Sequence, residues 1–249
     1  MKHRWTLLLV ALVCLPVLPA RAETTAAQIL DRVDDLYRGR SAHGKMTMKV
    51  TNPNYQRELR MEFWSLGTEK TLVRILEPLK ERRTATLKNG NNIWNYLPKV
   101  DRTIKIPSSM MGGAWMGSDF TNDDLVKEHR LARDYDPRIT FRGERGGQSV
   151  IEITCTPRPR AAVVWGKVMV SVRAPDFVPL ESLYYKENGA IARRMTFSEV
   201  RELGGRKIPT KMTVLPVDKP GHSTVVSYQS IEFDVELSPS LFTVENLRN

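Results

Sequence analysis

Apolar and polar residues alternate in about a dozen short segments of this 249-residue chain. The segments include KMTMKV (45–50), RELRMEFWS (57–65) and VIEITC (150–155). A period of two is typical of β-strands that turn one face toward a core. The turns between them, such as NGNN, RGGQ and ENGA, are short, which pairs successive strands antiparallel. We therefore predict a mainly β fold with few helices, in which about eleven to thirteen strands form one large, strongly curved antiparallel sheet.

One amphipathic helix is predicted ahead of these strands, in ETTAAQILDRVDDLYRG (residues 23–39). Thr25 and Gln28 have the spacing of a capping box, and Gly39 is a natural stop. The apolar residues that recur at helical spacing are Ile29, Leu30, Val33, Leu36 and Tyr37. A short helix of this kind depends on tertiary packing, so we expect it to lie on or inside the curved sheet.

The first 22 residues have the features of a cleavable signal peptide. Lys2 and Arg4 precede the apolar run WTLLLVALVCLPVL, and the sequence ARA at 20–22 has the small-x-small form of a cleavage site. We predict cleavage before Glu23 and an exported chain of 227 residues, which is 249 less 22. No linker or repeat divides this chain, so we expect a single domain over residues 23–249. Because the leader contains three basic residues, cleavage lowers the formal charge from +10 to +7.

A single cysteine, Cys155, remains after cleavage, so no disulfide can form within the chain. It alternates in phase with Ile151 and Ile153. Free cysteines are often buried, and we predict a core thiol.

The basic charge of an exported chain favours anionic lipid headgroups or an acidic partner surface over nucleic acid. Basic residues are concentrated in two segments, 80–83 and 99–105. The residues predicted to contact headgroups are Lys80, Arg82, Arg83, Lys99, Arg102 and Lys105. The alternative is that these residues only keep the surface soluble.

Motifs for catalysis are scarce. The three histidines of the exported chain, His43, His129 and His222, are isolated, and no nucleophile elbow or phosphate-binding glycine loop is present. Asp123 and Asp124 follow Thr121, which suits the first turn of a helix. We therefore predict a protein that is not an enzyme and uses no cofactor or metal.

The stretch SSMMGGAWMGSDF (108–120) contains three of the ten methionines, three glycines and a single charge. It opens a region of about thirty residues without strand pattern, longer than most loops of compact domains, and such loops are usually functional. Within it, Thr121–Val126 is predicted to form a short capped helical turn. The tail SPSLFTVENLRN is expected to form a further turn of helix that closes one end of the sheet.

Residues 94–125, WNYLPKVDRTIKIPSSMMGGAWMGSDFTNDDL, resemble the signature of LolA-like proteins described as outer-membrane lipoprotein-sorting proteins. The order of elements along the whole exported chain is also similar to that of the carriers LolA and LolB and the sensor RseB. The resemblance implies an unclosed barrel with a hydrophobic cavity for acyl chains, capped by helices, in a Gram-negative periplasm. It implies a carrier that takes lipid or lipoprotein from an inner-membrane transporter, of ABC or RND type, toward the outer membrane. The alternative is a regulatory protein of the same fold that binds a lipid or peptide signal and acts through a membrane partner.

Under this interpretation the cavity and its lid consist of apolar side chains. The predicted walls are Met61, Phe63, Val73, Ile75, Trp94 and Tyr96, and the predicted lid is Met110, Met111, Trp115, Met116 and Phe120. Methionine repacks around irregular ligands, and Gly112, Gly113 and Gly117 are predicted hinges. The alternative is a flap that caps its own core. Arg60 and Arg74 are candidates, by strand position, for the arginine that the cavity of the carriers contains. We expect a monomer.

Overall fold

The computed structural model describes residues 23–127, 131–161 and 163–248. The predicted signal peptide (1–22) and His129 lie outside these residues. Within them, no helix is long and apolar enough to cross a membrane.

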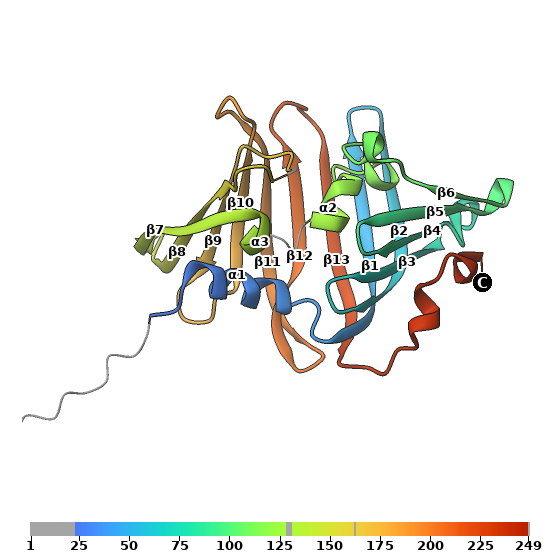
Figure 1. Cartoon of the computed structure of the whole chain (residues 1–249), viewed down its shortest axis with the longest axis horizontal. Coiled ribbons are helices and arrows are strands. Elements are labelled where there is room, and N and C mark those ends of the chain that lie inside the picture. Colours follow the sequence, from blue (N-terminus) through green and yellow to red (C-terminus); the bar gives the residue numbers. More distant parts are fainter. Residues whose placement is uncertain (1–22, 128–130, 162, 249) are drawn as a thin grey trace, which may run out of the picture.

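The described residues form thirteen strands in one antiparallel sheet (Figure 1). Their bounds are β1 Ser41–Asn52, β2 Tyr55–Leu66, β3 Lys70–Glu77, β4 Ala85–Asn89, β5 Asn92–Leu97, β6 Arg102–Lys105, β7 Tyr135–Arg145, β8 Gln148–Pro157, β9 Lys167–Arg173, β10 Pro179–Tyr185, β11 Ile191–Leu203, β12 Arg206–Pro216 and β13 Ser223–Phe233. The spatial order runs β6-β5-β4-β3-β2-β1-β13-β12-β11-β10-β9-β8-β7. Each strand therefore pairs with its neighbours in sequence, with two exceptions. β1 pairs with β13, and β6 and β7 do not pair with each other because they are the two edge strands of the sheet. The sheet does not close, which confirms the predicted fold class.

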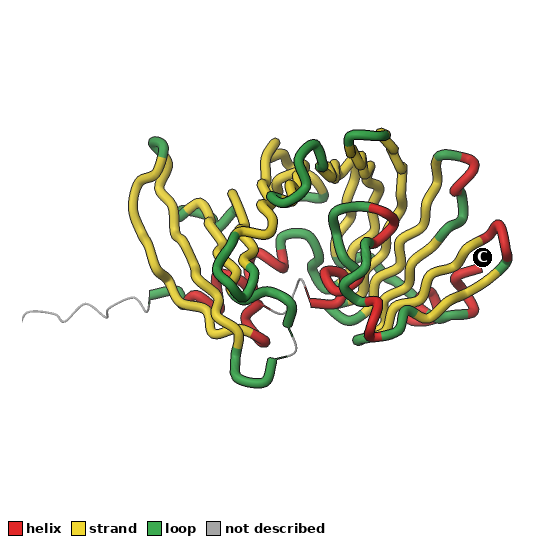
Figure 2. Tube along the Cα trace, turned by 90° about the horizontal axis from the view of Figure 1, so that it is seen from above, coloured by secondary structure: helices red, strands yellow, loops and turns green. Residues whose placement is uncertain are grey.

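Three short helices lie between the two wings of the curved sheet, as the view from above shows (Figure 2). They are α1 (Ala26–Asp35), α2 (Asn122–Lys127) and α3 (Leu131–Asp134). Thr25 caps α1 through the predicted capping box with Gln28, and Ile29 and Leu30 are buried. We call the face of the sheet that these helices cover the inner face.

The opposite, outer face is covered at one end by the C-terminal tail. Its 3-10 turns are η6 (Pro239–Phe242) and η7 (Glu245–Arg248), and they contact β3 and β4. Adjacent residues of β3 show the division, since Leu72 packs with Phe242 in an outer cluster and Val73 packs in the main inner cluster. This part of the sheet is therefore apolar on both faces.

Cys155 is fully buried on β8 in the inner cluster. Burial, with a smaller contribution from the charge of Asp34, raises the pKa of its thiol to about 12. The thiol is therefore protonated at neutral pH and unsuited to nucleophilic chemistry.

Candidate functional site

The region between β6 and β7 crosses the inner face of the sheet and provides the cover of a cavity. It contains two 3-10 turns, η3 (Ser108–Met110) and η4 (Trp115–Gly117), followed by α2 and α3. Trp115 and Phe120 point inward and are only 4% and 7% exposed. The indole Nε1 of Trp115 donates a hydrogen bond to Thr86 Oγ1 at 3.1 Å. We call residues 108–120 the lid.

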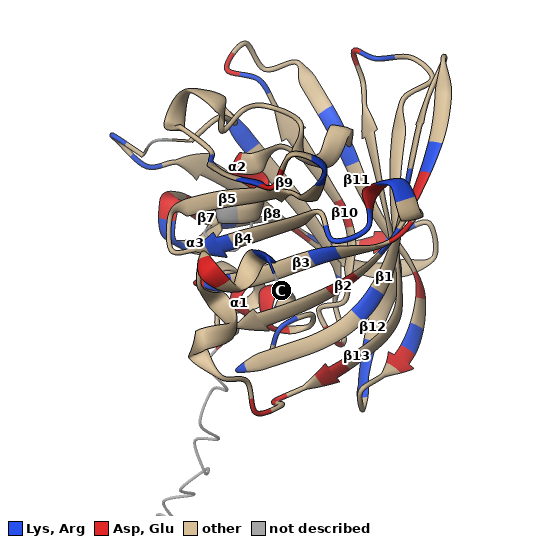
Figure 3. Cartoon of the chain, turned by 90° about the vertical axis from the view of Figure 1, so that its right-hand side faces the viewer, with Lys and Arg blue, Asp and Glu red and all other residues tan. Residues whose placement is uncertain are grey.

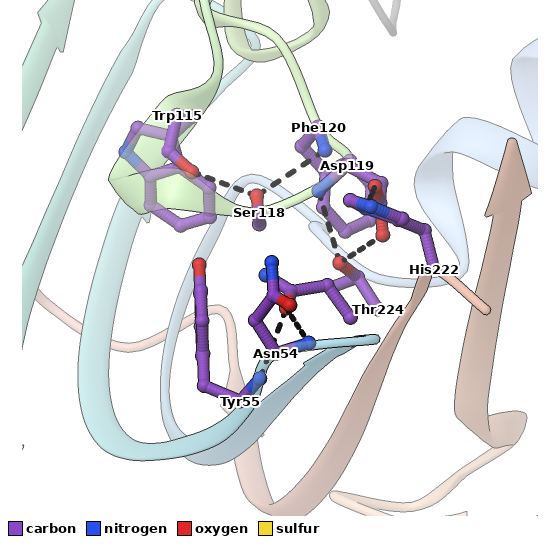
Figure 4. Close-up of polar contacts among 9 residues, drawn as sticks. Asn54, Tyr55, Trp115, Ser118, Asp119, Phe120, His222 and Thr224 are labelled. Carbon is purple, nitrogen blue, oxygen red and sulfur yellow. Dashed lines mark hydrogen bonds and ion pairs between the residues drawn. The ribbon is translucent and has the colours of Figure 1, made fainter. Parts of the chain in front are cut away.

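Polar contacts hold the Trp115–Phe120 part of the lid in place (Figure 4). Ser118 Oγ donates to the Trp115 carbonyl at 2.7 Å and accepts from the Phe120 amide at 3.2 Å. The Asp119 amide donates to Thr224 Oγ1 at 2.9 Å, and that hydroxyl donates back to Asp119 Oδ2 at 2.8 Å. The lid is thus tied to β13 by hydrogen bonds, with Trp115 and Phe120 as its apolar contacts to the sheet.

Left-handed backbone occurs within η4 and not at the predicted hinge pair. Met116 has φ 48° and Gly117 has φ 69°, whereas Gly112 and Gly113 have no positive φ. The Met116 carbonyl accepts a hydrogen bond from Arg57 Nη1 at 2.7 Å. Gly117 therefore has the left-handed conformation that favours glycine, whereas Gly112 and Gly113 do not have it in this arrangement, and the hinge role of the three glycines stays a prediction.

A cavity of about 140 Å³ lies beneath the lid. Its wall is mostly apolar and includes Phe63, Val73, Trp115, Phe120, Met212 and Tyr228. Met61 and Ile75 pack in the same cluster as these side chains. Pockets that hold small ligands usually measure roughly 300–1,000 Å³, so an acyl chain fits here only if the cover moves.

A second hollow of about 590 Å³, which we call the mouth, lies beside the lid. It is lined by Arg57, Lys80, Glu81, Lys99, Val100 and Met116, among others. Thr86 also lines the mouth, and its hydrogen-bond partner Trp115 lines the cavity. The Trp115 side chain therefore lies at the part of the cavity wall that adjoins the mouth.

The predicted wall residues Trp94 and Tyr96 lie on the other face of the sheet. They pair across the strands with Leu87 and Ala85, and all four belong to the outer cluster under the C-terminal tail. Cross-strand partners share a face, so the strand register excludes Trp94 and Tyr96 from the cavity wall. Their prediction as wall residues is corrected here.

The predicted lid residues separate into two groups. Trp115 and Phe120 are buried in the inner cluster, and Met116 packs against it. Met110 is 56% exposed, and Met111 is partly buried outside both clusters. Met110 and Met111 thus lie on the solvent side of the cover.

All six predicted headgroup residues are exposed and lie at the β4–β6 end of the sheet. Lys80, in η1 (Leu79–Glu81), and Lys99, in η2 (Pro98–Val100), line the mouth. Arg83 donates to the Arg248 carbonyl and Lys105 lies 5.6 Å from the ring centroid of Trp94, so these two face the C-terminal tail side. Arg82 donates to the Leu76 carbonyl, and Arg102 is on the edge strand β6. Figure 3 views this end and marks the Lys and Arg positions along the ribbon near β3, β4 and β5.

The two candidate cavity arginines do not line the cavity. Arg60 pairs with Glu77 at 3.1 Å, and both side chains are about half exposed. Arg74 stacks on Trp64 and donates to the Asn246 carbonyl in the tail, so it faces outward. Partial burial lowers the pKa of Arg74 from its ordinary value.

Arg193 is an arginine that reaches the inner face and that the sequence analysis did not identify. Its guanidinium makes two hydrogen bonds of 2.6 Å to the carboxylate of Asp124 in α2. Asp124 also completes the predicted cap with Thr121, through contacts of 2.7 and 3.2 Å. The signal was present in β11, where Arg193 has the same phase as the apolar Met195 and Phe197.

Each of the two described histidines lies near an acidic side chain. His43 lies 2.8 Å from Glu62 and stacks on Trp64, and His222 lies 3.8 Å from Asp119. Both are partly exposed.

Comparison with known proteins agrees with this architecture. A family model with the description "Uncharacterized protein" matches residues 67–249, most of the chain. The chain belongs to this family. No curated protein matches the sequence.

Solved structures add the fold. A LolA superfamily protein from Nitrosomonas europaea is 22% identical, with a TM-score of 0.75 over 90% of this chain and 99% of that one. A DUF1329 family protein from Desulfovibrio piger is 20% identical, with a TM-score of 0.80 over 89% and 97%. A domain from Vibrio parahaemolyticus described as outer-membrane lipoprotein-sorting is 21% identical, with a TM-score of 0.76 over 90% and 98%. The fold is LolA-like.

Proposed function

We propose that this protein carries the acyl chains of a lipid or lipoprotein in the cavity beneath the lid. The observation that carries the proposal is a mostly apolar cavity whose wall includes Trp115, next to a mouth lined by both charged and apolar side chains. In the proposed role the chain is exported and its signal peptide is cleaved after residue 22. The remaining residues, 23–249, work in the periplasm as a single monomeric domain. It receives cargo from an inner-membrane transporter and delivers it toward the outer membrane, without a catalytic step.

The energetics explain why a carrier needs such a cavity. Exposing a chain of about 15 methylenes to water costs roughly 12 kcal/mol, at about 0.8 kcal/mol for each one. A carrier must offset this cost with an apolar wall, yet it must release the chain to the next bilayer. A cavity that enlarges when its cover moves meets both needs, because the small cavity of about 140 Å³ in the present arrangement does not hold a whole chain permanently.

The test is lipid extraction from the purified protein followed by mass spectrometry. We expect acyl lipids or acylated peptides at up to one equivalent, and displacement of the fluorescent fatty acid cis-parinaric acid by them. A folded protein that yields no lipid and binds no fatty-acid probe would refute the carrier role. A pull-down of inner-membrane proteins with and without lipid separates a carrier from a sensor, because a sensor changes its partner when lipid binds.

Contact with an anionic bilayer is expected at the mouth. Leu79 and Val100 are 76% and 59% exposed, and each adjoins an exposed lysine, Lys80 and Lys99. A basic residue close to an anionic surface contributes about 1 kcal/mol, so Lys80→Gln with Lys99→Gln should weaken vesicle binding by about tenfold or more. Sedimentation with phosphatidylglycerol vesicles at low and high salt measures this.

The matched control is Lys45→Gln with Lys49→Gln. Both lysines are exposed on β1, away from the mouth, and the double variant removes the same charge. Equal loss of vesicle binding in the two double variants would mean that only net charge matters. Equal binding of the unaltered protein to phosphatidylcholine vesicles would make all six basic residues solubilising.

A further inference from the structure

Two hydroxyl groups in the wall of the cavity beneath the lid have no hydrogen-bond partner among the described residues. Ser65 and Thr71 both line this cavity, and Ser65 is only 4% exposed. Their oxygens, Ser65 Oγ and Thr71 Oγ1, are buried and make no hydrogen bond within the described chain. A buried hydroxyl without a bond is costly, and most such groups in native proteins have a partner. The pair therefore points to a partner that the described residues do not supply.

The strand register places these two side chains next to each other on the inner face. Ser65 of β2 pairs directly with Thr71 of β3. Each lies two positions from a residue of the inner cluster on its own strand, Phe63 and Val73, and so shares its face. Directly opposed residues of an antiparallel pair have Cβ atoms roughly 4.5–5.5 Å apart, so both hydroxyls can reach one ligand atom.

The pair lies at the end of the cavity that is remote from the mouth. Along β3, Thr71 and Val73 line the cavity, whereas Ile75 lines the mouth. Four residues of a strand span about 13 Å, at about 3.3 Å for each residue. An elongated ligand beneath the lid would therefore meet hydroxyl groups at one end and apolar side chains along the rest of its length.

The polar side chains of the cavity wall are mainly hydrogen-bond donors. The Tyr37 hydroxyl donates to the Pro209 carbonyl at 3.0 Å, and Arg38, whose guanidinium can only donate, also lines the cavity. No carboxylate or amide side chain is among the described residues of this wall. The wall therefore favours a ligand group that accepts hydrogen bonds. A carbonyl oxygen has two lone pairs and can accept from both free hydroxyls at once.

We propose that Ser65 and Thr71 form a binding site for the carbonyl group of an acyl ligand, a carboxylic acid or its ester, whose hydrocarbon chain extends from there toward Trp115. This inference rests on the proposed function and names the ligand group that the cavity recognises. Both hydroxyl oxygens are covered in the present arrangement. Rotation of each side chain about its Cα–Cβ bond brings the hydroxyl to the ligand when the cavity enlarges, and the two bonds then fix the direction of the chain.

The experiment compares methyl decanoate with 1-chlorodecane, which has a chain of equal length but no carbonyl group. Both displace cis-parinaric acid, whose own affinity is measured first in each variant. In the double variant Ser65→Ala with Thr71→Val, the affinity for methyl decanoate should fall by about tenfold, because two hydrogen bonds are lost. The affinity for 1-chlorodecane should change by less than about twofold, since it makes neither bond. Decanoate in place of the ester shows whether the acid or its ester is the better ligand.

The stability of the unliganded double variant separates a ligand site from a structural role. Neither hydroxyl makes a bond within the described chain, so their removal should leave the melting temperature unchanged or raise it. Hydroxyl groups that hold an internal water or support the fold would behave in the opposite way. A lower melting temperature together with an unchanged affinity for methyl decanoate contradicts the inference.

The matched control is Thr103→Val on β6. Thr103 Oγ1 is likewise buried without a hydrogen bond to the described residues, but Thr103 pairs with Tyr96 of the outer cluster and does not line the cavity. This variant should bind both ligands as the unaltered protein does. A loss of methyl decanoate affinity equal to that of the double variant would contradict a site at Ser65 and Thr71.

The outcomes also separate this inference from the carrier role. If the unaltered protein binds both ligands and the double variant loses affinity for both equally or for neither, the inference is overturned and the carrier role remains. Failure of the folded, unaltered protein to bind any of the ligands overturns both. If the double variant does not fold, Thr71→Ser and Thr71→Val decide, because only the first keeps a hydroxyl. Equal affinity of these two variants for methyl decanoate contradicts the inference.

Discussion

Replacing Trp115 with alanine is expected to lower the free energy of unfolding by about 3–5 kcal/mol and to speed the release of a bound fatty acid. The first effect follows from burial, because the ring is 4% exposed in the inner cluster. The second follows from position, since the ring lines the cavity and is hydrogen-bonded to Thr86, which lines the mouth. Denaturant unfolding gives the stability, and stopped-flow loss of cis-parinaric acid to acceptor vesicles gives the release rate.

The substitution Thr86→Val separates the two effects. It keeps the shape of the residue and the Trp115 ring but removes the hydrogen bond from the indole Nε1, together with the bond that the Thr86 hydroxyl donates to Asn95 Oδ1. The loss of stability should be only about 1–2 kcal/mol, whereas release should still be faster than in the unaltered protein. If Trp115→Ala unfolds the protein and Thr86→Val leaves the release rate unchanged, Trp115 is ordinary core and the lid hypothesis fails.

Replacing Val73 with phenylalanine is expected to abolish most fatty-acid binding while the fold persists. Val73 is 4% exposed and lines the cavity of about 140 Å³, so the larger ring can enter the space that the acyl chain needs. We expect the stability to change by less than about 1.5 kcal/mol, because the added volume fills a void rather than a packed core. Fatty-acid affinity should fall by more than about tenfold, because the phenylalanine ring would clash with the acyl chain.

Leu72→Phe is the matched control, one residue earlier on the same strand. Leu72 is fully buried in the outer cluster, on the opposite face from the cavity. Overpacking there should cost about 1–3 kcal/mol and leave fatty-acid binding unchanged. Unaltered affinity in a folded Val73→Phe variant would mean that acyl chains bind elsewhere.

The local pattern of the sequence was sufficient to predict the strands, the first helix and its cap, and the antiparallel order. Period-two alternation and short turns act between residues close in sequence, so they can be read without tertiary information. The start of the helix at Thr121–Asp124 could be predicted for the same reason, because its capping hydrogen bonds join two residues that are three positions apart in the sequence. The inward orientation of Trp115 and Phe120 also agrees with the apolar character of the lid.

The face of each strand could not be predicted where both faces are covered. In β3 the inner side carries Val73 and Ile75 in the main cluster and the outer side carries Leu72 under the C-terminal tail, so apolar residues stand on both faces. The alternation of side chains then does not indicate which face of the strand points toward the cavity. Trp94 and Tyr96 looked like wall residues for this reason, and only their register opposite Leu87 and Ala85 places them under the tail.

The partners of the buried charges depend on the tertiary structure in the same way. Arg193 shares the phase of apolar residues along β11, which indicates an inward position but names no counter-ion. Asp124 is 69 residues away in the chain and reaches Arg193 only because α2 crosses the inner face. The sequence by itself thus determined the elements and the apolar lid, because those depend on neighbours. The tertiary structure decided the cavity wall, the mouth and the ion pair, because each depends on which distant segments meet.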